Sequence, residues 1–252
     1  MSAPTNWLLL RGLMRERRHW AGFAEELAAR SGTRVLALDL PGVGTDRDRR
    51  SPASVPAIVD DLRGRFLAAR AQHSDGPWSV FAPSLGGMIA LCWAERHPED
   101  FVRVVVCNTS TKDLGSTFER FSPLALRTVL VSLAASVVAP DAVARERRTL
   151  ALVSNTAHGR AHAEQFARFS NDAPVGRRVL VRQLWAASRT TAPRSLSVSV
   201  IVMCSDGDRL CSSTISRALA ARLDAPLRVH PTGGHDLPLD DPDWVIEQLL
   251  GS

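Results

Sequence analysis

The segment Val80–Leu91, VFAPSLGGMIAL, contains the arrangement that decides the fold. A strand-like apolar run ends at Ala82-Pro83, and Ser84 and a helical pattern follow. A nucleophile at a sharp strand-to-helix turn needs small residues two positions before and two after it, because strand and helix pass closely there. Ala82 and Gly86 are small, although glycine is usual at the first position. The segment alone leaves two interpretations: a strained nucleophilic serine, or an ordinary strand-to-helix connection.

The chain around this segment alternates strand-like and helix-like patterns. Strands are expected at Trp7–Leu10, Arg34–Leu38, Trp78–Phe81, Val102–Cys107, Val198–Cys204 and Leu227–His230. Helices are expected at His19–Ser31, Val55–His73, Leu85–His97, Ser212–Leu223 and Asp243–Leu250. Strands that alternate with helices form βαβ units, so the pattern predicts an α/β fold with a mostly parallel twisted sheet covered by helices on both faces.

Residues 114–193 interrupt this alternation. They contain amphipathic helical patterns, such as Leu124–Val138 and Val179–Ser188, and no strand pattern. Ligands of open α/β sheets bind outside the carboxyl ends of the strands, so an all-helical insertion is expected to cover that edge as a cap. The predicted organisation is a core of residues 1–113 and 194–252 with a helical cap of residues 114–193.

Partners for a nucleophilic serine occur far downstream. A serine hydroxyl needs a base that accepts its proton and a carboxylate that orients the base. His235 follows a predicted strand and two glycines, and Asp206 and Asp208 both follow another predicted strand. Because the carboxyl ends of parallel strands meet at one edge, Ser84, one of the two aspartates and His235 are candidates for a catalytic triad.

Five stretches together resemble the α/β-hydrolase superfamily, in its cap-bearing serine esterase-like branch. They are LLLRGLMRERRHW (8–20), VLALDLPGVGTD (35–46), VFAPSLGGMIAL (80–91), VIVMCSDGDRLCSS (200–213) and GGHDLPLDDPDWV (233–245). The five stretches occur in the same order and at the usual intervals of the corresponding motifs in the family, and together they cover the chain except the cap. The resemblance implies that Ser84 is the nucleophile and His235 the general base. It favours Asp208 as the acid, because Asp208 lies three residues after the small Ser205, and it matches Asp206 to an acidic but non-catalytic neighbour.

The same resemblance implies an oxyanion hole made of backbone N–H groups. One donor is expected at Leu85, the residue after the nucleophile, and the second at Leu13, in the loop after the first strand. This loop usually begins His-Gly in the family and here begins Arg11-Gly12. Gly12 keeps the backbone freedom of the loop. How the loop is supported with Arg11 in place of histidine is left open.

A serine nucleophile predicts acyl transfer to water, with a carboxylic ester as the leading substrate and thioesters, lactones or amides as alternatives. Carbon–carbon bond hydrolases and cofactor-free haloperoxidase-like enzymes use the same triad, and a catalytically silent ligand-binding homologue is a further alternative. The expected partner is a small-molecule acyl substrate. Apolar cap residues suggest that part of this substrate is apolar, although packing of the cap onto the core is the favoured interpretation for most of them; they are Leu124, Leu126, Val129, Leu130 and Leu133.

Composition excludes several other functions. The net charge of +5 comes almost entirely from arginines, which are interleaved with acidic residues as on solvated surfaces, so nucleic-acid binding is not expected. No signal peptide and no apolar run long enough to span a bilayer occurs, which predicts a cytoplasmic protein. The arginine excess is typical of a GC-rich bacterial genome. The oligomeric state is left open.

No metal or cofactor is expected. The cysteines show no CxxC pairing and mostly lie in apolar runs, as buried thiols do; they are Cys92, Cys107, Cys204 and Cys211. His158 and His162 lie four residues apart without a third ligand, which does not favour a zinc site. The glycines of residues 39–46 lack the Gly-Lys-Ser/Thr that completes a phosphate-binding loop.

Overall fold

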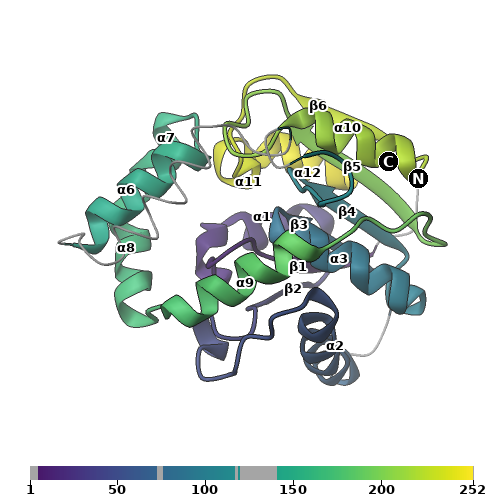
Figure 1. Cartoon of the computed structure of the whole chain (residues 1–252), viewed down its shortest axis with the longest axis horizontal. Helices are drawn as coiled ribbons and strands as arrows, with labels where there is room; N and C mark the ends of the chain where they lie inside the picture. The colour runs from purple at the N-terminus through teal and green to yellow at the C-terminus, as the bar shows by residue number, and fades with distance from the viewer. Residues whose placement is uncertain (1–4, 73–75, 117–118, 120–140, 252) are drawn as a thin grey trace.

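The computed structural model describes residues 5–72, 76–116, 119 and 141–251. Six parallel strands form one sheet in the order β2-β1-β3-β4-β5-β6 (Figure 1). The strands are β1 (Asn6–Leu10), β2 (Val35–Leu38), β3 (Trp78–Pro83), β4 (Arg103–Cys107), β5 (Ser199–Ser205) and β6 (Leu227–His230). All run in one direction, so the loops that follow them gather at one edge of the sheet.

Helices connect the strands. Those of the core are α1 (Phe23–Ser31), α2 (Val55–Ala71), α3 (Leu85–Arg96), α10 (Ser213–Arg222), α11 (Leu237–Asp240) and α12 (Pro242–Leu250). Short 3₁₀ helices are η1 (Arg17–Trp20), η2 (Gly44–Asp46) and η3 (Pro98–Asp100). Between β4 and β5 lie α6 (Ala142–Val153), α7 (Ala157–Ala161), α8 (Ala163–Asp172) and α9 (Arg177–Arg189). The predicted α/β fold with a parallel sheet is confirmed.

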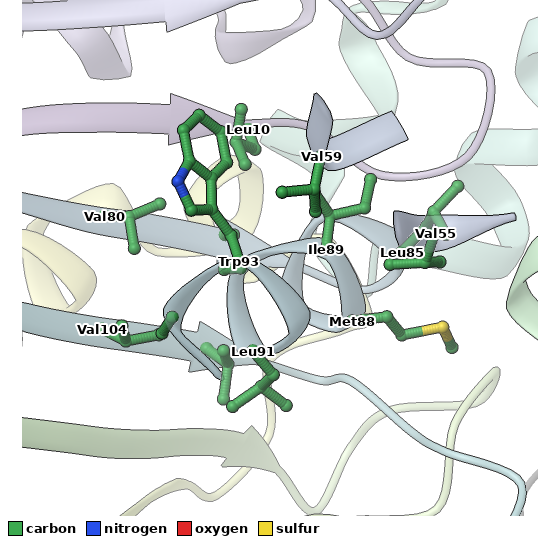
Figure 2. Close-up of a cluster of buried hydrophobic side chains, with 14 of the residues drawn as sticks. Leu10, Val55, Val59, Val80, Leu85, Met88, Ile89, Leu91, Trp93 and Val104 are labelled. Atoms are coloured by element: carbon green, nitrogen blue, oxygen red, sulfur yellow. The ribbon is translucent and has the colours of Figure 1, made fainter. Parts of the chain in front are cut away.

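Apolar side chains alternate between the two faces of the sheet, because successive residues of a strand point to opposite sides. In β1, Leu8 and Leu10 pack in a cluster with side chains of α2, α3 and α10. Trp7 and Leu9 pack in a second cluster with side chains of α1 and α12. Figure 2 shows part of the first cluster around Trp93 of α3. The helices therefore cover both faces, and only the edges and ends of the sheet remain for a binding site.

The predicted strands and core helices agree with the structure to within two residues, with one exception. The single helix expected over His19–Ser31 is divided into η1 and α1. Ala21 and Gly22 between them have positive φ angles of 50° and 90°, which no α-helix accommodates. Gly22 allows this break because it has no Cβ. The four-residue helix α11, which begins two residues after His235, is not predicted by the sequence pattern.

The helices inserted between β4 and β5 contact the loops at the carboxyl ends of the strands. Asn155, between α6 and α7, donates its side-chain N–H to the carbonyl oxygens of Gly207 and Thr232, at 2.8 Å each. The side chain of Gln183 on α9 accepts the backbone N–H of Met14. Figure 1 shows α6, α7 and α8 beside the sheet and α9 crossing in front of it. The helix predicted at Val179–Ser188 is present as α9.

The other helix expected in the insertion, Leu124–Val138, lies outside the described residues, as do all five apolar cap residues named above. Among the described residues, no helix combines the length and the apolar character that crossing a bilayer requires.

Candidate active site

Ser84 occupies a strained turn between β3 and α3. Its backbone angles, φ 55° and ψ −124°, lie outside the regions that residues with a side chain usually adopt. The surrounding chain holds this conformation: Ser84 donates its N–H to the carbonyl oxygen of Cys107 at 2.8 Å, and its own carbonyl accepts the hydroxyl of Thr109 at 2.8 Å. Strain held in this way is typical of functional sites. Of the two interpretations of the sequence, the strained turn is the one observed.

Small residues allow the close approach at this turn. A Cβ added to Gly86 would lie 2.6 Å from the carbonyl oxygen of Leu10, so only glycine fits there. Ala82 is completely buried in the cluster between the sheet and α3, and its single methyl group is accommodated. A Cβ added to Gly12 would lie 3.2 Å from the Cβ of Ser84. The loop after β1 therefore passes directly against the serine.

The structure distinguishes the two candidate acids. Asp208 Oδ2 lies 2.7 Å from Nδ1 of His235, and Asp208 Oδ1 accepts the backbone N–H groups of Leu210 and Cys211. The Asp208 side chain is only 1% exposed. Asp206 instead accepts hydrogen bonds from Ser213 and Arg217 of α10 on the surface. Asp208, and not Asp206, is paired with the histidine.

The environment of His235 favours a positive charge on its imidazole. Burial by itself lowers the pKa of His235, but the neighbouring Asp208 carboxylate and Cys211 outweigh burial, and the pKa is raised well above its usual value. A carboxylate on Nδ1 fixes the proton there, which leaves Nε2 as the nitrogen able to accept a proton. The pair can therefore accept a proton and stabilise the imidazolium that results.

Asn108, which directly follows β4, holds the loop that carries His235. Its side-chain N–H donates to the carbonyl oxygens of Gly234 and His235, and its side-chain oxygen accepts the N–H of Ser205. Asn108 is buried and has a positive φ of 47°, which asparagine tolerates better than most residues. The end of β4 thus supports both the Ser84 turn, through Cys107 and Thr109, and the histidine loop.

Arg11 supports the loop after β1, at the position where the resemblance leads us to expect histidine. Its guanidinium donates to both carboxylate oxygens of Asp236, the residue after His235, and it also lies over the ring of Trp20 at 4.7 Å. Arg11 and Asp236 are both buried. Burial raises the pKa of Asp236, but Arg11 outweighs this effect and the pKa is lowered overall. The pair joins the loop that carries Leu13 to the loop that carries His235.

The two expected oxyanion donors lie on two different segments next to Ser84, namely the start of α3 and the loop after β1. Leu85 is the first residue of α3, where backbone N–H groups have no acceptor within the helix. Leu13 follows Gly12 in the loop that contacts the serine, and the next residue, Met14, is held by Gln183 at 3.0 Å. Gln183 is completely buried.

Sequence reasoning missed these supporting residues, because Arg11, Asn108 and Gln183 are separated from their partners by 225, 127 and 169 residues. Among the hydrogen bonds of the described residues, none joins Ser84 to His235. Such bonds are often long before the substrate binds.

Comparisons with known proteins agree with this architecture. A family model described as "Serine aminopeptidase, S33", of the Hydrolase_4 family, matches residues 6–242. The human ABHD14B protein is 35% identical over 86 residues, which cover 33% of this chain and 40% of that protein. A pimeloyl-[acyl-carrier protein] methyl ester esterase from Chromobacterium violaceum is 38% identical over 93 residues, covering 37% of this chain and 32% of the esterase. The matches thus span at most two fifths of these curated relatives.

Solved structures share the fold over the whole chain. A thermophilic esterase from Thermogutta terrifontis superimposes with a TM-score of 0.73 at 21% identity, covering 99% of this chain and 89% of the esterase. The RedJ thioesterase of prodiginine biosynthesis from Streptomyces coelicolor superimposes with a TM-score of 0.64 at 15% identity, covering 98% of this chain and 86% of that one. At such identities the likeness concerns the fold alone.

Proposed function

Because the chain belongs to the Hydrolase_4 (serine aminopeptidase S33) family of α/β-hydrolases, we propose that it hydrolyses carboxylic esters through an acyl-enzyme on Ser84, with His235 as the base and Asp208 as the orienting acid. One observation carries this proposal: the hydrogen-bonded Asp208–His235 pair and the strained Ser84 turn both follow parallel strands of one sheet. The order of these strands places β4 between them, and Asn108 and Thr109 at its end support both loops.

In the first step the Ser84 oxygen attacks the carbonyl carbon of the ester, and Nε2 of His235 accepts the hydroxyl proton. The carbonyl π electrons move to the oxygen, and the N–H groups of Leu85 and Leu13 stabilise the resulting oxyanion. Each such donor is typically worth about 3 kcal/mol in the transition state. When the tetrahedral intermediate collapses, the bond to the alcohol breaks and the imidazolium returns the proton to the leaving oxygen.

In the second half of the reaction a water molecule attacks the acyl-enzyme. His235 accepts one proton of this water, and the second tetrahedral intermediate collapses to release the carboxylic acid and restore the Ser84 hydroxyl. Asp208 keeps the imidazole oriented and stabilises its positive charge in both halves, which agrees with the raised pKa of His235. No cofactor takes part in these steps.

We further propose that residues 114–193 form a cap that selects the substrate. The described helices of this interval contact the loops after β1, β5 and β6, through Arg15–Glu146, Asn155 and Gln183. A cap in this position would bound the space above Ser84 on one side. The expected substrate is a small acyl compound with an apolar portion, and thioesters, lactones and amides belong to the same proposal.

A fluorophosphonate probe tests the nucleophile. We expect it to label the wild-type protein at Ser84 and to leave Ser84→Ala unlabelled, while p-nitrophenyl butyrate is turned over only by proteins that are labelled. Ser213→Ala is the matched control, because Ser213 begins α10, the helix that follows β5, but is bonded to Asp206. Labelling of folded Ser84→Ala at the wild-type rate, or no labelling of the folded wild type, would contradict the proposal.

A substrate panel then separates the alternatives. Esters of increasing acyl length, acyl thioesters, lactones and aminoacyl anilides distinguish the acyl-transfer reactions. A labelled protein that turns over none of them, yet cleaves a vinylogous diketone, would instead support carbon–carbon bond hydrolysis.

A further inference from the structure

The structure brings a cysteine to the acid–base pair. Three potential metal-ligand atoms, one each from Asp208, Cys211 and His235, lie within 4.8 Å of one another. Among the described residues this is the only such group of three. Cys211 is not in a disulfide and is 6% exposed. The spacing of the cysteines along the sequence does not show this group, because His235 is supplied by a different loop.

The loop after β5 places the thiol. Asp208 accepts the backbone N–H of Cys211 at 3.0 Å and that of Leu210 at 2.7 Å, which turns the chain tightly between the two side chains. The same carboxylate contacts His235 through its other oxygen.

We propose that Asp208, Cys211 and His235 form a binding site for Zn²⁺, and that the bound ion reversibly inhibits the hydrolase. Carboxylate oxygen, thiolate sulfur and imidazole nitrogen are all common zinc ligands, and three protein ligands leave a fourth position for water. The thiolate selects zinc over Mg²⁺ and Ca²⁺, which prefer oxygen ligands.

The distances suit a tetrahedral ion after small movements. Zinc bond lengths of 2.0 to 2.3 Å separate tetrahedral ligand atoms by roughly 3.5 Å. Ligand atoms that lie within 4.8 Å of one another therefore need to move by roughly 1 Å or a little more. When the ion binds Nδ1, the 2.7 Å contact between His235 and Asp208 must open by roughly 0.8 Å.

Binding changes the protonation of the site. The Cys211 thiol loses its proton to solvent and a zinc–sulfur bond forms. The imidazole binds in its neutral form, so an imidazolium gives up the proton of its ligating nitrogen to solvent. An ion that Asp208 also binds must occupy Nδ1, the nitrogen that faces this carboxylate. Nε2 then carries the one proton of the neutral imidazole and cannot accept the proton of Ser84. Metal binding therefore removes the base, so the inhibition, unlike the binding itself, rests on the proposed function.

Binding is tested without measuring activity. Zn²⁺ is titrated calorimetrically into the folded protein, and Co²⁺ is used as a probe whose near-ultraviolet charge-transfer band reports a thiolate ligand. We expect one ion per chain and the thiolate band in the wild type and in Cys92→Ser, a control cysteine on α3. Both signals should be lost in Cys211→Ser and Cys211→Ala whose folding is verified by circular dichroism. Absence of Zn²⁺ binding to the wild type, or equal binding by the Cys211 variants, would overturn the site.

Inhibition is tested with p-nitrophenyl butyrate. Zn²⁺ should reduce the rate of the wild type and of Cys92→Ser, and EDTA should restore it. Each Cys211 variant is compared with its own metal-free rate and should lose much less of it. Equal inhibition of the Cys211 variants would refute the inhibitory role. A wild type that binds Zn²⁺ through the thiolate but hydrolyses no ester would refute the proposed function and leave the metal site established.

Discussion

Asp206 and Asp208 are two residues apart and have opposite environments. The Asp206 side chain is 47% exposed and pairs with Arg217, whereas Asp208 is almost completely buried against His235. The side chain of Ser213 and then Arg217 lower the pKa of Asp206, as an exposed carboxylate in an ion pair requires. The two aspartates therefore differ in position and not in chemistry, and only Asp208 is placed to orient the histidine.

Replacing the two aspartates one at a time measures this difference. In Asp208→Asn the amide cannot stabilise the imidazolium, and the tautomer of His235 changes, so we expect kcat to fall by about 10³- to 10⁴-fold. In Asp206→Asn we expect less than about a threefold change, because an exposed ion pair contributes little. Initial rates with p-nitrophenyl butyrate decide the matter, and equal losses in the two variants would contradict the assignment.

The raised pKa of His235 also predicts the pH dependence of the wild type. The base must be neutral to accept the proton of Ser84, so kcat/KM should rise with pH and reach its plateau only above the ordinary imidazole pKa of about 6.5.

At the scale of elements, the contact between β1, β3 and α3 determines the geometry of the site. The first turn of α3 passes so close to the end of β1 that a Cβ added to Gly86 would lie 2.6 Å from the carbonyl oxygen of Leu10 and 2.9 Å from that of Arg11. Ser84 is half-buried at this crossing, and α3 starts directly after it. By contrast, Gly64 on α2 faces open space, with nothing within 4 Å of an added Cβ. The two glycines offer a matched comparison.

Gly86→Ala should destabilise the protein and reduce activity, whereas Gly64→Ala should not. A methyl group 2.6 Å from a backbone oxygen forces the helix away from the strand, at a cost of about 1–3 kcal/mol, and displaces Ser84 and Leu85. Gly64→Ala should be neutral or stabilising by about 0.5–1 kcal/mol, because alanine is the better helix former. Urea unfolding measures both effects. A Gly86→Ala protein as stable and as active as the wild type would show that the crossing is not tight.

At the scale of the whole molecule, residues from the two ends of the chain meet beneath the site. Arg11 follows β1 and Asp236 follows β6, at opposite ends of the strand sequence, and they form a buried bidentate ion pair. A second pair, Arg30–Asp243, also joins the first and last parts of the chain, but Asp243 is 77% exposed. Burial makes the first pair sensitive to loss of either partner.

Removing one partner of the buried pair leaves the other charge without compensation. We expect Arg11→Ala to lower the free energy of unfolding by about 3–5 kcal/mol, and Arg30→Ala by less than about 1 kcal/mol. The double variant Arg11→Ala/Asp236→Ala should be more stable than the sum of the single variants predicts, since no uncompensated charge remains. Denaturant titrations of the wild type, Arg11→Ala, Asp236→Ala and the double variant test this coupling, with Arg30→Ala as the surface control. Additive effects would show that the two residues are not coupled.

Local patterns in the sequence determined the elements of this protein: the alternation of apolar runs set the six strands, and the small residues around Ser84 set the turn. These features follow from backbone geometry and from the two-residue and 3.6-residue periodicities, which need no knowledge of distant contacts. For the site, the sequence placed the serine, two aspartates and the histidine after strands that share one edge.

Only the tertiary structure decided which of these side chains meet. It shows that Asp208 pairs with His235 and that Cys211 lies beside this acid–base pair. It also shows that the loop after β1 is supported by the ion pair between Arg11 and Asp236. Each of these contacts depends on how separate loops lie relative to one another across the sheet, and loop positions depend on packing of the whole core. Sequence spacing carries no record of such distances.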